Sequence, residues 1–448
     1  MRKPRIQKTF GGLAAALITL AIGASCSAAA PLRLDVRSEN RMILIPGPGD
    51  GTVQVQVIAP DLSYPDDRPK LNLALVIDRS GSMADARKLE YVRTAAHQLI
   101  DLMGNDDILS IVAYDHQVSV PFPARRIDGN RQTLHRIVAG IYPGGRTFLS
   151  GGLEEGFRQA RSARRSGYVN RVLLLSDGLA NVGVTGRHAL RDRAATMAEY
   201  GISVSTFGVG NHFDEELLAM TASGGGGSYR YLGDPEQIVA ALSSEFQTAS
   251  RTSAGDVEIV IRLRNGCRFG SVLGREWRRD GDAYIVRLGD LSAGERRTVF
   301  ASLNVPGTTP GVREVGEVTV RYRDPVSGNP VAAAPLPVSL ELVRDEARYR
   351  QGFDRSVQER KAVAQSGALV QEAARLADQG RKEQAKELLG KAAAGLAAAP
   401  PSPAVREEME RADAYRKQLD SLTDMGSDEA KGAQKAIKYR SYEILNRQ

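Results

Sequence analysis

The sequence predicts an α/β domain with a doubly wound, mostly parallel sheet, inserted in an antiparallel β-sandwich and followed by a C-terminal α-helical segment. Three observations support this fold class. Between residues 72 and 248, short apolar runs alternate with amphipathic runs, which is typical of a parallel sheet covered by helices. On either side of this region, apolar and polar residues alternate with the two-residue period of half-buried strands. From Asp345 onward, the composition shifts to Ala, Arg, Gln and Glu with helical periodicity.

The α/β domain is expected to span residues 71–248. Its apolar runs, such as "LNLALVI" and "RVLLLS", are continuous rather than alternating, as expected of strands that are buried on both faces. The run "ILSIVAYDHQVSVPF" has the form of a hairpin, so we expect it to add one antiparallel edge strand. In such a sheet, ligands bind beyond the carboxyl ends of the strands. The runs "DRSGS" and "SDGLANVG" both stand at such ends.

The β-sandwich is expected to be split in the sequence. Residues 26–70 contain two strand-like runs around a Gly/Pro turn, and residues 251–343 contain five more. Two strands cannot bury a hydrophobic face by themselves. We therefore expect the N-terminal strands to complete the later sheet, with the α/β domain inserted between them.

The helical segment, residues 345–448, is interrupted at Gly380 and at "AAPPSP". The run "QEAARLADQGRKEQAKELLGKAAAGL" predicts an antiparallel helix pair that is similar to one tetratricopeptide unit. A single pair without neighbours does not make a solenoid. We expect this segment either to pack on the sandwich or to extend from it as a partner-binding appendage.

Residues 1–25 have the features of a secretory signal peptide. Four basic residues and no acidic one precede the apolar run "GGLAAALITLAIGAS", which is short for a membrane span. Cys26 follows directly, as at a bacterial lipoprotein processing site, although Gly23 stands where Leu is usual. We expect a lipid anchor at Cys26 that holds the protein on a membrane; the alternative is ordinary cleavage near residues 28–30.

This leader predicts an exported protein of the cell envelope, either lipid-anchored and facing the periplasm or the outside, or else periplasmic or secreted. Removing the four basic residues of the leader lowers the formal net charge from +7 to +3. The basic composition therefore predicts no nucleic-acid partner. The sequence carries no indication of the oligomeric state.

Oxygen-bearing side chains recur at the predicted carboxyl edge of the sheet. They are Asp78, Ser80 and Ser82 after one strand, Thr147 ahead of a helix, and Asp177 after the central apolar strand. On its own, the first group could equally be a polar turn that caps the next helix. Together, two carboxylates and three hydroxyls suit a hard divalent cation rather than zinc. With few charges and room for water, Mg²⁺ fits better than Ca²⁺, and Mn²⁺ is a further alternative.

With this motif, the chain resembles a von Willebrand factor type A domain with a metal-ion-dependent adhesion site, over roughly residues 71–247. The resemblance implies that Ser80 and Ser82 ligate the metal directly, that Thr147 joins them in the binding-competent arrangement, and that the two aspartates act largely through water. It also implies an open coordination position, commonly filled by a carboxylate of a partner protein. The wider arrangement resembles bacterial relatives of inter-alpha-trypsin inhibitor heavy chains and of the calcium-activated chloride channel proteins.

The function we expect is metal-dependent binding of a protein ligand that presents an acidic residue, or adhesion, at the cell envelope. Arg146, beside the threonine of the motif, could pair with a partner carboxylate. The alternative is an assembly scaffold in which the metal site is structural and the helical segment binds partners. Catalysis is not expected, because the five histidines form no recognisable triad and no GxSxG, HExxH, P-loop or CxxC motif occurs. Asp115 is expected on the surface, and His212 in solvent rather than at the site.

Overall fold

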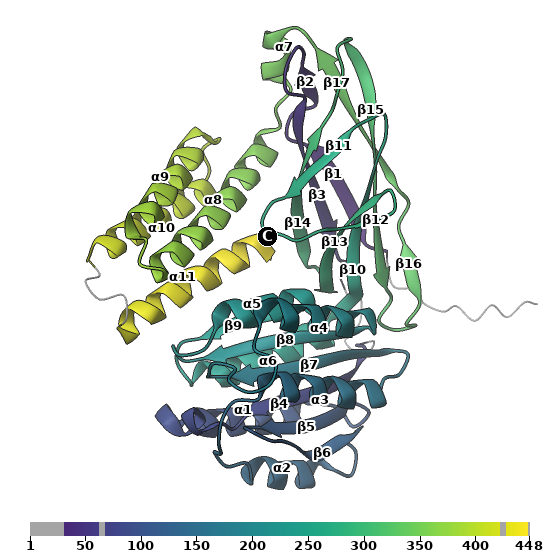
Figure 1. The fold of residues 1–448 in the computed structure, drawn as a ribbon. Helices are drawn as coiled ribbons and strands as arrows, with labels where there is room; N and C mark the ends of the chain where they lie inside the picture. Colours follow the sequence, from purple (N-terminus) through teal and green to yellow (C-terminus); the bar gives the residue numbers. More distant parts are fainter. Residues whose placement is uncertain (1–30, 62–67, 422–426, 447–448) are drawn as a thin grey trace, which may run out of the picture.

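The chain folds into three parts (Figure 1), and the computed structural model describes residues 31–61, 68–421 and 427–446. The α/β unit lies at one end, the β-sandwich at the other, and the helical segment beside both. This arrangement confirms the predicted fold class. The predicted signal peptide, residues 1–25, and the predicted lipidation position, Cys26, lie outside the described residues. In the part of the chain that is described, no helix is long and apolar enough to cross a membrane.

The α/β unit is built on a six-stranded sheet with the order β6-β5-β4-β7-β8-β9. β6 pairs antiparallel with β5, which confirms the predicted edge strand, and the other pairs are parallel. The other edge strand, β9, begins within the run of four glycines at residues 224–227. The bounds are β4 (Lys70–Asp78), β5 (Ile108–Tyr114), β6 (Val118–Arg126), β7 (Tyr168–Ser176), β8 (Ile202–Val209) and β9 (Gly226–Leu232).

Helices cover both faces of this sheet. Alternate side chains of β4 show why its apolar run is continuous: Leu73 and Leu75 enter one core cluster, and Ala74 and Val76 enter the other. The first cluster includes α1 (Lys88–Leu102), α2 (Arg131–Ala139) and α6 (Gln237–Ser250). The second includes α3 (Leu149–Ser162), α4 (Arg187–Glu199) and α5 (Glu215–Gly224). A short 3₁₀ turn, η2 (Gly81–Arg87), joins β4 to α1.

The sandwich consists of a four-stranded sheet, β1-β3-β14-β11, and a seven-stranded sheet, β12-β13-β10-β15-β17-β2 with β16 beside β15. β3 lies between β1 and β14, and β2 pairs with β17, so the α/β unit is an insertion. The bounds are β1 (Arg33–Ser38), β2 (Met42–Leu44), β3 (Asp50–Ile58), β10 (Thr252–Leu263), β11 (Arg268–Val272), β12 (Arg278–Asp280), β13 (Ala283–Ser292), β14 (Arg296–Asn304), β15 (Gly311–Arg323), β16 (Pro330–Ala332) and β17 (Leu336–Val343).

The first N-terminal run splits into two strands where one was expected. The Asn40 side-chain oxygen accepts a hydrogen bond from the backbone N–H of Met42 at 2.9 Å, a local bond that turns the chain. β1 and β2 therefore enter different sheets.

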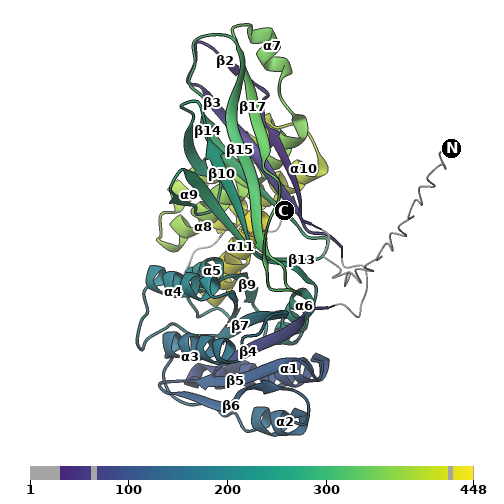
Figure 2. The same ribbon diagram turned by 90° about the vertical axis from the view of Figure 1, so that its right-hand side faces the viewer.

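The helical segment contacts both other parts (Figure 2). At its start, Val357 packs against Phe300 of the sandwich, and Lys361 Nζ lies 2.6 Å from Glu39 Oε2. At its end, α11 packs on the α/β unit, which neither expected arrangement included. The bounds are α7 (Glu346–Gln351), α8 (Arg355–Asp378), α9 (Lys382–Ala398), α10 (Pro403–Ser421) and α11 (Asp428–Asn446). The predicted pair is α8 and α9, joined through Gly380 at φ +75°.

Candidate metal centre

The predicted site residues lie on three loops at the carboxyl edge of the six-stranded sheet. Asp78 is the last residue of β4, and Asp177 follows the last residue of β7. β4 and β7 are neighbouring parallel strands, so both carboxylates leave the sheet at the same edge. Thr147 lies in the loop that leads into α3.

Asp78 is fully buried, and both its carboxylate oxygens are engaged within the protein. Oδ1 accepts the backbone N–H of Ser80 at 2.8 Å, and Oδ2 accepts the Ser176 hydroxyl at 2.8 Å. Burial, with the charge of Asp177 adding to it, raises the pKa of Asp78 to about 6. A carboxylate held in this way favours a nearby cation, and its occupied oxygens suit contact with a metal through water.

Two of the three predicted hydroxyl ligands, those of Ser82 and Thr147, lie near one position, and the third, that of Ser80, contacts the first. Ser80 Oγ lies 3.2 Å from Ser82 Oγ, and Ser82 Oγ donates to Asp177 Oδ1 at 2.8 Å. A methyl group built on Gly178 would lie 3.3 Å from Thr147 Oγ1 and 3.7 Å from Ser82 Oγ. The missing side chain of Gly178 therefore leaves room directly beside hydroxyls that come from two loops.

Reciprocal hydrogen bonds fix Thr147 to the loop after β7. Its N–H donates to Asn181 Oδ1 at 3.0 Å, and the N–H of Asn181 donates to the Thr147 carbonyl at 3.2 Å. Thr147 is 4% exposed. The position of its hydroxyl is therefore set by the same loop that carries Asp177.

The expectation that Asp115 lies on the surface is wrong, because its side chain is buried at the base of these loops. Its Oδ2 lies 2.9 Å from Arg79 Nη2 and accepts the N–H of Gly145 at 3.3 Å. A side chain on Gly144 would clash with this carboxylate. Asp115 therefore ties the Thr147 loop to the residue after Asp78. The two glycines before "RT" were the sequence signal for this close approach.

Lys88 is the second residue that the sequence did not single out. Its Nζ lies 2.6 Å from Asp177 Oδ2, and its side chain is 9% exposed. Its stem lies against the loop after β8, since a methyl group on Gly210 would be 3.4 Å from Lys88 Cε. At neutral pH, the two carboxylates and this ammonium leave the centre with a single negative charge.

Two exposed residues border the centre. Arg146 precedes Thr147 and is exposed. Leu179, two residues after Asp177, is 59% exposed. His212 lies elsewhere: its Nε2 is 3.4 Å from Asp428 Oδ1 of α11, so it belongs to the contact with the helical segment.

The donor set fits a hard divalent cation. Among the described residues, no group of three or more His, Cys, Asp or Glu is placed to hold a metal. A centre at this edge would therefore depend on the hydroxyls, and oxygen-only donors with few charges are the ligands that Mg²⁺ takes in proteins.

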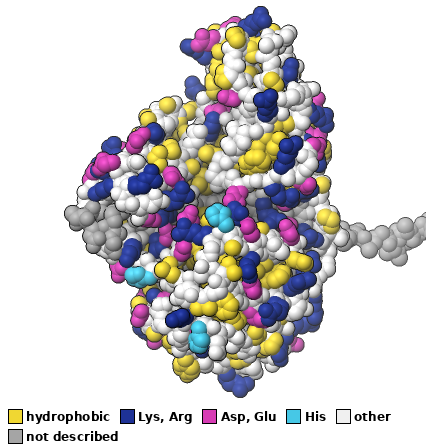
Figure 3. Space-filling model, viewed as in Figure 1, with side chains coloured by type: hydrophobic (Ala, Val, Ile, Leu, Met, Phe, Trp, Pro, Cys, Tyr) yellow, Lys and Arg dark blue, Asp and Glu magenta, His cyan; other side chains and the backbone are white. Residues whose placement is uncertain are grey.

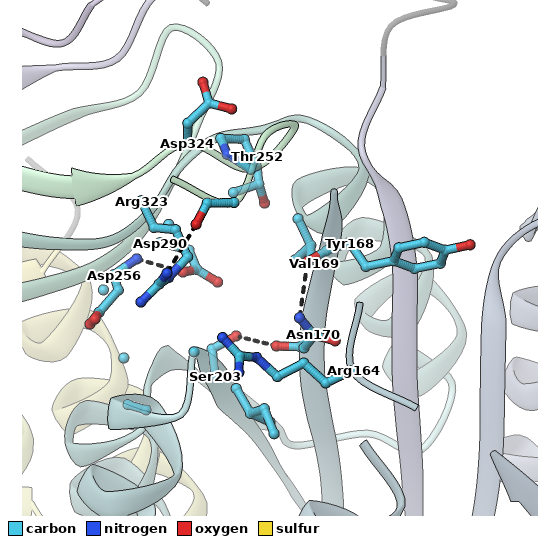
Figure 4. A pocket seen from close by; sticks show the side chains of 18 of the residues that line it. Arg164, Tyr168, Val169, Asn170, Ser203, Thr252, Asp256, Asp290, Arg323 and Asp324 are labelled. Atoms are coloured by element: carbon cyan, nitrogen blue, oxygen red, sulfur yellow. Dashed lines mark hydrogen bonds between the residues drawn. The ribbon is translucent and has the colours of Figure 1, made fainter. Parts of the chain in front are cut away.

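Two cavities lie away from this edge. One of about 310 Å³ (Figure 4) lies at the amino ends of β7 and β8, where Arg323 Nη1 donates to the Gly328 carbonyl at 3.0 Å. A larger one, about 690 Å³, lies where the three parts meet, and Figure 3 shows the surface hollowed there. Several of its charged side chains pair with one another, as Arg191 does with Glu276 and Lys438 with Glu215.

Comparisons with known proteins agree with the fold. Residues 72–244 match the family model of the von Willebrand factor type A domain. The solved structure of a von Willebrand factor type A protein from Catenulispora acidiphila has a TM-score of 0.75 at 17% identity, covering 93% of this chain and 97% of that one. The ArnB paralog VWA2 from Sulfolobus acidocaldarius has a TM-score of 0.59 at 16% identity, covering 94% and 100%.

Two relatives share more of the sequence. The protein sll0103 of Synechocystis is 28% identical over 309 residues, which is 66% of this chain and 71% of that protein. YfbK of Escherichia coli is 26% identical over 313 residues, which is 67% of this chain and 52% of YfbK. The chain thus spans about half of YfbK. From the matched residues and the fold, the chain carries a von Willebrand factor type A domain, inserted in a β-sandwich and followed by helices.

Proposed function

We propose that the protein binds a protein partner at the bacterial cell envelope through a divalent cation, Mg²⁺, at the edge of its α/β unit. Ser80, Ser82 and Thr147 would ligate the ion directly, and Asp78 and Asp177 would act largely through water. An acidic side chain or C-terminal carboxylate of the partner would complete the coordination sphere. Von Willebrand factor type A domains are typically interaction modules, which supports this proposal.

The convergence of hydroxyls beside Gly178 carries the proposal. Thr147 Oγ1 and Ser82 Oγ come from separate loops, and they lie 3.3 and 3.7 Å from the position that a methyl group on Gly178 would take. Hydroxyls that only capped turns would bond within their own loops, and nothing would bring them to a shared position. A cation that takes oxygen ligands explains why hydroxyls from two loops lie near one position.

Charge explains why the partner would be acidic. The buried carboxylates of Asp78 and Asp177, with the ammonium of Lys88, sum to one negative charge, and a divalent ion changes the sum to one positive charge. A further anionic oxygen is then favoured at an open coordination position. The exposed guanidinium of Arg146 adds to this attraction.

An exposed apolar residue beside the centre indicates a second feature of the partner. Leu179 is 59% exposed beside the centre, and burying it on binding would contribute about 1.5 to 3 kcal/mol at most. The partner we propose therefore presents an acidic residue next to an apolar one. Arg146→Ala and Leu179→Ala should each weaken partner binding without changing the Mg²⁺ affinity.

A pull-down from a surface-protein extract tests the proposal. The protein should capture a partner in Mg²⁺ and lose it in EDTA, and the Asp78→Ala, Asp177→Ala double variant should capture none even in Mg²⁺. Asp128→Ala, an exposed carboxylate of the same unit, is the matched control. Capture that survives both EDTA and the double variant would replace this proposal with the scaffold reading, in which the helical segment binds the partner.

The envelope location has its own test. We propose that Cys26 is lipidated and holds the protein on a membrane. Cys26→Ser should then release the protein from the membrane fraction with the fold intact, and the mature mass should include acyl chains. A mature mass that begins at Ala29 or Pro31 without acyl chains would contradict the lipid anchor.

A further inference from the structure

Two of the five histidines lie together on the surface of the α/β unit, although they are far apart in the sequence. His97 of α1 and His135 of α2 place their Nδ1 atoms 2.8 Å apart. Their rings are stacked, with centroids 5.0 Å apart and an angle of 29° between the planes. Nothing in the proposed function uses this pair.

The protons on the two rings can be assigned from their neighbours. His135 Nε2 lies 3.1 Å from Asp101 Oδ1, and a carboxylate can only accept, so Nε2 of His135 holds a proton. Burial, and then the neighbouring His135 and Arg93, hold the pKa of His97 below its usual value. With its proton on Nε2, the ring of His135 carries a free lone pair on Nδ1, and this nitrogen lies 2.8 Å from Nδ1 of His97.

We propose that His97 and His135 form a second metal site, which binds a nitrogen-preferring divalent transition metal, Cu²⁺ before Ni²⁺, through both Nδ1 atoms. On binding, His97 carries its proton on Nε2 instead of Nδ1, so both rings stay neutral and the ion takes the place of the shared proton. Water fills the remaining positions. Among divalent metals of the first transition row, Cu²⁺ generally binds such ligands most tightly.

The distance between the two nitrogens selects the metal. With metal–nitrogen bonds of about 2.0 to 2.1 Å, nitrogens 2.8 Å apart subtend an angle of about 85° to 90° at the ion. That is the angle between neighbouring ligands in the tetragonal sites of Cu²⁺ and Ni²⁺. Tetrahedral zinc would require nitrogens about 3.3 Å apart.

The surroundings give the pair a fixed geometry. Arg131, at the start of α2, donates to the carbonyls of Ile100 and Met103 at the end of α1, the second at 2.9 Å. This contact holds the spacing of the two helices. Asp101 orients the ring of His135 through Nε2, in the way carboxylates commonly support metal-binding histidines.

Cu²⁺ titration of the full exported chain, purified without a histidine tag, tests the site. Millimolar Mg²⁺ is present so that the oxygen-rich centre is filled. Calorimetry should give one Cu²⁺ per chain, and the electron paramagnetic resonance spectrum should show coupling to imidazole nitrogen. His97→Gln and His135→Gln should each weaken Cu²⁺ binding at least 10-fold, and Asp101→Asn about 10-fold. His188→Gln, an exposed histidine on α4, should leave it unchanged.

Circular dichroism and the melting temperature show whether each variant is folded. Unchanged Cu²⁺ affinity in the folded His97→Gln, His135→Gln double variant would overturn the proposal, as would a spectrum without nitrogen coupling. The Asp78→Ala, Asp177→Ala variant separates the two sites: it should keep its Cu²⁺ binding, and loss of that binding would place the ion at the oxygen-rich centre instead. Tighter binding of Zn²⁺ than of Cu²⁺ would also contradict the proposed geometry.

Discussion

Lys88 and Asp115 lie at the candidate metal centre without belonging to the predicted ligand set. Lys88 supplies a fixed cation at 2.6 Å from Asp177 Oδ2, and Asp115 holds the loop of Thr147 through Arg79 and Gly145. Neither residue needs to touch the ion to affect its binding. Lys88 acts through charge, and Asp115 acts through the position of a ligand.

Replacing Lys88 by Met should tighten Mg²⁺ binding by roughly 10-fold or more, because one positive charge is removed a few ångströms from the ion. In EDTA the same variant should be less stable than the parent protein, since Asp177 loses its partner. Calorimetry with Mg²⁺ and melting curves with and without the ion measure both effects. Lys70→Met, at the opposite end of β4, is the control; weaker Mg²⁺ binding in Lys88→Met would show that the ammonium supports the ion.

Asp115→Asn should weaken Mg²⁺ binding about 10-fold, because the side chain that ties Gly145 of the Thr147 loop to Arg79 loses its charge and its ion pair with Arg79. The loss should appear in the Mg²⁺ affinity even after the variant is shown to be folded. The double variant Thr147→Val, Asp115→Asn should lose little more Mg²⁺ affinity than Thr147→Val alone, since both changes act on the same ligand. If the losses of Mg²⁺ affinity in the two single variants add up fully in the double variant, Asp115 does not act through Thr147.

At the scale of elements, α11 is fastened to the loop that follows β8. Lys435 Nζ donates to the Phe213 carbonyl at 2.7 Å and lies over its ring, and the Tyr442 hydroxyl accepts the N–H of Tyr229 at 3.2 Å. Lys435 and Lys438 both pair with Glu215. Although burial opposes it, this pairing with Lys438 and Lys435 lowers the pKa of Glu215 to about 2.

Glu215 therefore stabilises the docking of α11 in a defined pH range. Its pKa in the folded protein is lower than the usual 4.5, so its contribution is complete above about pH 4.5 and is lost as the pH falls towards 2. Glu215→Gln should lower the free energy of unfolding by roughly 3 kcal/mol at pH 7, with a smaller difference at pH 3. Urea unfolding measures this, with Glu429→Gln as an exposed control on α11. A difference that is constant between pH 7 and pH 3 would contradict it.

At the scale of the whole molecule, one buried arginine joins the α/β unit to the sandwich. Arg171 of β7 lies 2.7 Å from Glu245 of α6 and 2.7 Å from Asp290 of β13, and its side chain is 3% exposed. The helical segment, which contacts both parts, provides a second connection between the insertion and its host. The candidate metal centre lies at the other end of β7.

Arg171→Met should destabilise the protein by about 3 to 5 kcal/mol, because it leaves buried carboxylates without their partner. Mg²⁺ affinity should be unchanged, since the substitution lies at the amino end of the strand. Thermal unfolding and Mg²⁺ titration of the same variant give both quantities. Arg158→Met, whose side chain is 69% exposed, should cost no more than about 1 kcal/mol. If Arg171→Met melts at the same temperature as this control, Arg171 does not stabilise the contact between the α/β unit and the sandwich.

The sequence predicts what depends on local patterns and misses what depends on contacts between distant segments. Strands such as β4 and β7 show in their continuous apolar runs, and the oxygen ligands show in their positions after those strands. Short strands such as β12, Arg278–Asp280, carry too few residues for a pattern. The burial of Asp115 and the docking of α11 depend on partners 30 or more residues away, so no local periodicity indicates them.

The central claim is that hydroxyls from two loops bind one Mg²⁺, and calorimetric titration of Mg²⁺ tests it most directly. Thr147→Val removes a hydroxyl while keeping the shape of the side chain, and Ser82→Ala removes the other hydroxyl beside Gly178. The account predicts one Mg²⁺ per chain, at least a 10-fold loss of affinity in each variant, and no loss in Ser162→Ala, an exposed serine of α3. Mg²⁺ affinity that is the same in all four proteins, or absent from the parent protein, would contradict it.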